Sequence, residues 1–113
     1  MITVDDVRRV ALPLPRTTEH LIRDRIKFKV KQYVYCAFSR DETLIGFAFP
    51  KEERLMLVES EPDKFLMPPQ GDLRYHWVMA RMSALDVPEM TELVTDAWRM
   101  VVPKSVAREH LGD

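Results

Sequence analysis

The alternation of apolar and charged residues is most regular at residues 25–31, and it predicts a β-strand. Ile26, Phe28 and Val30 fall on one face of an extended chain, and the residues between and around them are all cations. Side chains of a strand point alternately to its two faces, so this pattern predicts one buried face and one solvated face. The solvated face carries Arg25, Lys27, Lys29 and Lys31.

Further strands are predicted from other runs of β-forming residues. Two such runs, residues 33–38 and 44–49, follow the first strand closely and are separated by a polar turn. Strands joined by turns this short pair antiparallel, because parallel pairing needs a long crossover. Residues 65–67 and 75–82 predict two more strands, the first of which is a short edge strand stopped by two prolines.

Apolar residues spaced by three and four predict helices at both ends of the chain and one between the strands. The first covers residues 3–12, where a threonine and two aspartates suit the free N–H groups of a helix start. The second begins after Pro50 and ends before Pro62. The third opens at Pro88, and residues 105–110 are expected to add one further turn beyond a proline.

The element order α-β-β-β-α-β-β-α indicates an α+β fold, with an antiparallel sheet of about five strands and helices packed on one face. A length of 113 residues suits one domain, which we expect to cover residues 1–113. Cys36 is the only cysteine, which fits a reducing cytosol. The charged first ten residues do not fit a signal peptide and the apolar stretches are too short for a bilayer, so we expect a cytoplasmic protein without membrane contact.

Patterns typical of a catalytic or metal centre are missing from the sequence. Cys36 lies within an apolar strand, which favours a core position over a reactive thiol. The three histidines lack ligand spacing, and the three glycines form neither a phosphate loop nor a dinucleotide fingerprint. We therefore expect no enzymatic activity, no cofactor and no metal. A less favoured alternative is a small-molecule pocket near Tyr75, His76 and Trp77, although such aromatic residues more often pack in a core.

The cations of residues 25–31 are the main functional signal. Alternate residues of a strand lie about 6.6 Å apart, close to the spacing of phosphates along a nucleic-acid strand. The formal net charge is −1, so a polyanion would have to be bound by a local patch. Two structural interpretations compete with this one: a merely solvated face, and lysines that protect an edge strand against mispairing. A docking site for an acidic protein partner is the second functional alternative.

Motifs along nearly the whole chain resemble those of the MmcQ/YjbR family. They are Val7-Arg-Arg-Val-Ala-Leu-Pro-Leu-Pro15 with Thr18-Glu19, Ile26-Lys-Phe-Lys-Val30, Phe65-Leu-Met-Pro-Pro69 followed by Trp77, and Ala97-Trp-Arg-Met-Val-Val-Pro-Lys104. The resemblance implies a double-wing fold similar to frataxin and CyaY. It also implies DNA binding, which for family members rests largely on fold analogy.

Two departures limit what the resemblance implies. Residues 70–74 lack the fuller glycine-rich loop that the family pattern leads us to expect, and a basic strand stands where iron binding would need an acidic ridge. The leading hypothesis is therefore a non-enzymatic domain that binds DNA or another polyanion. In this hypothesis Arg25, Lys27, Lys29 and Lys31 contact phosphates, which gives affinity without sequence reading.

Overall fold

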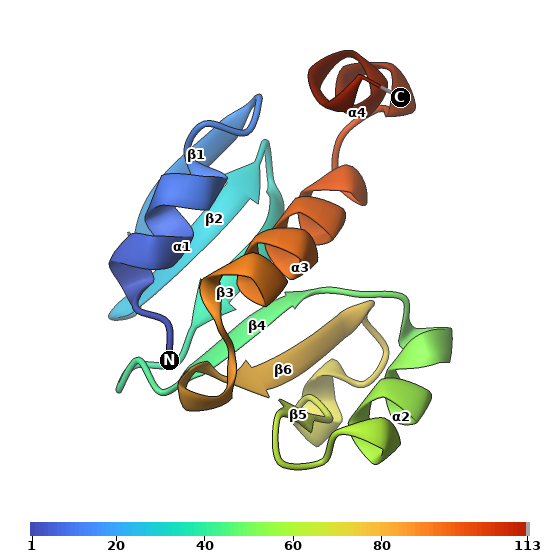
Figure 1. Cartoon of the computed structure of the whole chain (residues 1–113). Coiled ribbons are helices and arrows are strands. Elements are labelled where there is room, and N and C mark those ends of the chain that lie inside the picture. Colours follow the sequence, from blue (N-terminus) through green and yellow to red (C-terminus); the bar gives the residue numbers. More distant parts are fainter. Residues whose placement is uncertain (113) are drawn as a thin grey trace.

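The computed structural model describes residues 1–112, which form a six-stranded antiparallel sheet of order β1-β2-β3-β4-β6-β5. The strands are β1 (Thr17–Ile22), β2 (Arg25–Val30), β3 (Tyr33–Phe38), β4 (Leu44–Ala48), β5 (Phe65–Leu66) and β6 (Trp77–Arg81). The helices are α1 (Val4–Ala11), α2 (Lys51–Ser60), α3 (Val87–Arg99) and α4 (Lys104–Leu111). Helices α1 and α3 lie side by side across one face of the sheet, α2 packs beside β5 and β6, and α4 follows the end of α3 (Figure 1).

The core lies between the sheet and helices α1 and α3. Strand alternation directs every second side chain of the central strands toward these helices, among them Phe28, Ile45, Phe47, Val78 and Ala80, all buried. Helix α3 packs against them with a buried stripe of residues at helical spacing, made by Met90, Val94, Ala97 and Trp98. These side chains belong to one hydrophobic cluster, whose burial is the main favourable term in folding.

Two polar contacts fix the start of α1 and the connection from α1 to β1. Thr3 caps α1, since its side chain accepts a hydrogen bond from the Asp6 N–H while the Asp6 carboxylate accepts one from the Thr3 N–H. The Trp98 indole Nε1–H donates to the Pro15 carbonyl at 2.8 Å, across 83 residues of sequence. The segment that leads into β1 is thereby tied to α3.

The predicted α+β class and element order are confirmed, and the structure adds one strand to the expected five. Strand β1 was not predicted from the sequence, because apolar and polar residues do not alternate strictly in Thr17–Ile22. Its turn into β2 also lacks the usual Asn-Gly signal: Arg23 and Asp24 adopt φ values of 54° and 64° instead. The expected final turn is an eight-residue helix, α4, which ends at Gly112 with φ 74°. None of the helices in residues 1–112 is both long and apolar enough to cross a membrane.

Candidate nucleic-acid interface

The sheet face opposite α1 and α3, called the outer face below, carries Arg25, Lys27 and Lys29 of β2. Phe28 and Val30 are buried on the helix side, so alternation turns these three cations outward, where Lys27 and Lys29 are partly exposed and Arg25 is exposed. Strand β2 pairs with β1 on one side and β3 on the other, and the edges of the sheet are β1 and β5. The interpretation of these lysines as edge protection is therefore wrong.

No carboxylate from a strand balances these cations. Within the described residues Arg25, Lys27 and Lys29 take part in none of the ion pairs. The one acidic residue in the six strands is Glu19 of β1, which is in register with buried Phe28 and so faces the helices. There the Arg8 Nε and Nη2 groups each donate to its carboxylate at 2.8 Å, and this pairing lowers the Glu19 pKa.

A row of residues in register crosses the outer face from β1 to β5. It runs through His20, Lys27, Ala37, Gly46, Met79 and Leu66. The centre of the row consists of two small residues, Ala37 and Gly46, and the Trp77 indole fills the space over Gly46. A Cβ atom at position 46 would come within 2.5 Å of the Trp77 Nε1 atom, so only glycine leaves room for the ring.

Trp77 therefore belongs to the outer face and is only partly buried there. Its backbone lies on β6, three strands from β2, but its ring lies over Gly46 of β4, two strands from β2, which corresponds to about 10 Å at normal strand spacing. The outer face thus combines a cationic strand with a partly exposed aromatic ring. Charged groups for phosphates and a ring for bases are the two components of single-strand binding surfaces.

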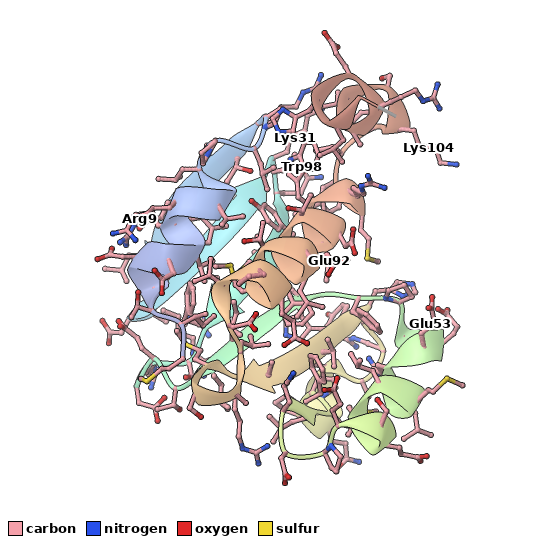
Figure 2. The ribbon with its side chains drawn as sticks, in the orientation of Figure 1. Arg9, Lys31, Glu53, Glu92, Trp98 and Lys104 are labelled. Carbon is pink, nitrogen blue, oxygen red and sulfur yellow. The ribbon has the colours of Figure 1, made fainter. Side chains whose placement is uncertain are left out.

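Lys31, the fourth predicted contact, does not continue the row on β2. The strand ends at Val30, and Lys31 enters the turn to β3 with a φ of 56°. It lines a hollow of about 330 Å³, called the corner hollow below, whose walls include Arg16, Tyr33, Met100, Val101 and Pro103. Figure 2 shows Lys31 at the end of the sheet nearest α4.

Residues 75–77, where the sequence suggests a pocket, contribute side chains with separate partners. His76 Nδ1 accepts a hydrogen bond from the Lys51 N–H at 3.0 Å and caps α2, since Pro50 at the N-cap offers no side-chain acceptor. Tyr75 is exposed, with the Arg74 guanidinium 4.8 Å from its ring centroid. Trp77 lies on the outer face. None of the three side chains lines the corner hollow.

Cys36, the one thiol among residues 1–112, is buried in the core. Burial raises the pKa of the Cys36 thiol, so the reactive thiolate is disfavoured. No group of three or more His, Cys, Asp or Glu side chains in the described part of the chain could hold a metal ion.

The family model for YjbR matches residues 12–100. The chain belongs to the YjbR family. Uncharacterized proteins of Mycobacterium tuberculosis (Rv2570) and Mycobacterium bovis (Mb2600) are each 27% identical over 128 residues, covering 100% of this chain and 98% of their own. The crystal structure of Deinococcus radiodurans protein DR2400, with a DUF419 domain, matches with a TM-score of 0.79 at 22% identity, covering 99% of this chain and 89% of that one.

These comparisons confirm the family seen in the sequence motifs and, through the crystal structure, the fold. The outer face of this YjbR-family protein lies wholly inside the matched residues 12–100. The corner hollow lies partly outside them, because Val101 and Pro103 follow the matched range.

The fold of this YjbR chain also depends on Arg54, which sequence reasoning missed. Arg54 of α2 is 6% exposed, and its guanidinium donates to the carbonyl oxygens of Leu73, Tyr75 (2.8 Å) and Trp77 (3.2 Å). These bonds hold residues 73–77 to α2 and help to place the start of β6. An arginine next to two glutamates in a helix is typical of a solvated surface, so its pattern gives no signal of burial.

Proposed function

We propose that the outer face binds nucleic acid, and that it prefers single strands to duplexes. The observation that carries the proposal is the open row of Arg25, Lys27 and Lys29, on a face to which no strand contributes a carboxylate. Ammonium and guanidinium groups donate charge-assisted hydrogen bonds to phosphate oxygens. Contacts of this kind position a nucleic acid and give affinity without reading its sequence.

The preference for single strands rests on Trp77. Stacking of one base on an aromatic side chain contributes about 1–3 kcal/mol, but bases inside a duplex are already stacked on each other. A single strand can lay its phosphates along β2 and turn a base onto the Trp77 ring, which lies over Gly46 at the centre of the face. A rigid duplex gains only the phosphate contacts.

Salt dependence and charge reversal test the proposal together. With three phosphate contacts, a plot of log affinity for a twelve-nucleotide thymidine strand against log salt concentration should have a slope of about −2. The affinity should therefore fall roughly sixteenfold between 50 and 200 mM salt. Fluorescence anisotropy with a labelled strand measures this slope. Lys27→Glu with Lys29→Glu should lower the affinity at least tenfold and flatten the slope.

The matched control is the double variant Arg9→Glu with Lys51→Glu, which makes the same change of net charge at exposed residues of α1 and α2. Arg9 projects from α1 away from the sheet (Figure 2). An equal loss in both double variants would show that only net charge matters, and no loss in the first would remove the outer face from binding. Tighter binding of a polyglutamate peptide than of the oligonucleotide at equal salt would favour an acidic protein partner instead.

Trp77→Ala tests the strand preference separately. It should weaken binding of the thymidine strand by about tenfold, as expected for loss of one stacked base, and leave duplex binding nearly unchanged. Equal weakening for both would refute the preference while leaving the phosphate contacts in place.

A further inference from the structure

The corner hollow forms where three segments distant in sequence meet at the end of the sheet. The connection from α1 to β1 contributes Arg16, the turn from β2 to β3 contributes Lys31, and the connection from α3 to α4 contributes residues 100–103. Its volume of about 330 Å³ is at the lower end of the range of ligand pockets. A hollow of this size suits a small molecule or one unit of a polymer.

The charge around the hollow is of one sign. Its two charged lining residues are Arg16 and Lys31, no carboxylate lines it, and within residues 1–112 neither cation is held in an ion pair. A second hollow of about 300 Å³, beside the start of α4, is lined by Arg99, Lys104, Ala107 and Arg108. Of these residues, Lys104 directly follows Pro103 of the corner hollow, and its positive charge beside the hollow favours an anion.

The rest of the lining is apolar and partly open to solvent. Tyr33 is 54% exposed and Met100 is 41% exposed, and Val101 and Pro103 complete this wall. Helix α4 begins directly after Pro103 without a side-chain cap, so the positive end of its dipole adds to the two cations. Cations beside an apolar wall with an aromatic ring match a ligand that has one anionic end and one flat, less polar end.

We propose that the corner hollow binds a phosphate monoester that carries a flat group, as in a nucleoside 5′-monophosphate. Arg16 and Lys31 bind the phosphate, and Tyr33 and Met100 contact the flat group. The same chemistry has two sources: a free nucleotide, or the 5′-phosphorylated end of a strand held on the outer face. Lys31 lies in the turn directly after Val30, the last residue of β2, so the hollow lies close to the end of that strand. The second source alone rests on the proposed function.

Nuclear magnetic resonance titrations with adenosine 5′-monophosphate, inorganic phosphate and adenosine test the site. The monophosphate should shift the amide signals of residues 31–33 and 100–104 and bind at least tenfold more tightly than adenosine. Arg16→Gln and Lys31→Gln should each weaken its binding about tenfold, the usual effect of losing one hydrogen bond to a charged group. The matched controls Arg9→Gln and Lys51→Gln should leave it unchanged, and unshifted signals elsewhere show that each variant is folded.

Equal affinity for adenosine and its monophosphate would overturn the proposal. So would unchanged binding by Arg16→Gln and Lys31→Gln, or shifts confined to the outer face. Thymidine strands with and without a 5′-phosphate distinguish the two sources: a gain from the phosphate that is lost in Arg16→Gln indicates the strand end, and no gain indicates the free nucleotide. Binding of the monophosphate without any oligonucleotide binding would refute the proposed function and leave this site supported.

Discussion

Replacement of Arg54 by methionine should destabilise the fold and loosen the segment that precedes Trp77. Methionine keeps an unbranched apolar stem on α2 but cannot donate to the carbonyl oxygens of Leu73, Tyr75 and Trp77, which the guanidinium now satisfies. A buried acceptor that loses its donor costs about 1–3 kcal/mol. The cost is therefore set by how many of the three carbonyl groups water can reach in the variant.

The structure narrows that number. Leu73 and Tyr75 belong to an exposed segment, so water can replace the lost donor there, whereas Trp77 lies within β6. Removal of the arginine also relieves a cost, because its Nε–H is buried without a hydrogen-bond partner among the described residues. The full penalty at the Trp77 carbonyl plus reduced penalties at the other two carbonyls gives a net loss of about 2–3 kcal/mol. In a chain of this length, such a loss lowers Tm by about 8–12 °C.

Urea unfolding followed by circular dichroism measures the loss, and amide hydrogen exchange locates it. Exchange should accelerate at residues 73–77 more than in β2 or α3. Arg54→Lys keeps the charge and removes the unpaired Nε–H, so it should lose less stability than Arg54→Met. A free energy of unfolding within 0.5 kcal/mol of the unchanged protein for Arg54→Met, or uniform acceleration of exchange, would refute this account of the carbonyl contacts.

Three further predictions follow from single contacts. The Glu19 pKa is lowered in the folded state, so its pair with Arg8 stabilises the fold at pH values above the ordinary glutamate pKa, and this stabilisation is lost as the pH falls below about 4. Urea unfolding at pH 7 and at pH 3 measures how much stability each protein loses in acid. That loss of stability should be smaller in Glu19→Gln than in the unchanged protein, by up to about 1 kcal/mol. Equal losses would contradict this. Asp24→Gly should raise Tm by a few degrees, because glycine adopts the φ of 64° without the cost of about 1 kcal/mol that other residues bear; a lower Tm would count against it. Gly46→Ala should displace the Trp77 ring and shift its indole N–H resonance, whereas Gly71→Ala, with open space around its Cβ, should not.

The parts of the fold that the sequence predicts are those with strong periodicity. Strand β2 alternates without exception, and the stripe on α3 has clean helical spacing, so both are found at nearly their true positions. Strand β1 has neither feature, and its turn uses Arg23 and Asp24 where pattern rules look for Asn-Gly. Its existence follows from pairing with β2, which is a tertiary effect.

The candidate site was only partly predictable for the same reason. Alternation predicts that Arg25, Lys27 and Lys29 share a face, but the end of β2 at Val30 decides that Lys31 belongs to a different place. The apolar neighbours of Trp77 in the sequence predict a core position for it. In the register of β6 with β4, Val78 and Ala80 point to the helix side of the sheet, and the Trp77 ring lies over Gly46 on the outer face. Contacts between strands distant in sequence carry this information, and no local pattern does.

The net charge of −1 conceals a separation of charge that bears directly on binding. Among the acidic residues of the described range 1–112, Glu19 is the one that lies in a strand, and it faces the helices, where Arg8 neutralises it. Beyond a Debye length of about 8 Å a polyanion therefore meets a nearly neutral protein, and little long-range steering is available. Within that distance it meets the cations of β2 and, on β6, Arg81, whose guanidinium donates to the carbonyl oxygens of Pro62 and Asp63. Charge reversal at Lys27 and Lys29 should consequently act on the lifetime of a complex more than on its rate of formation.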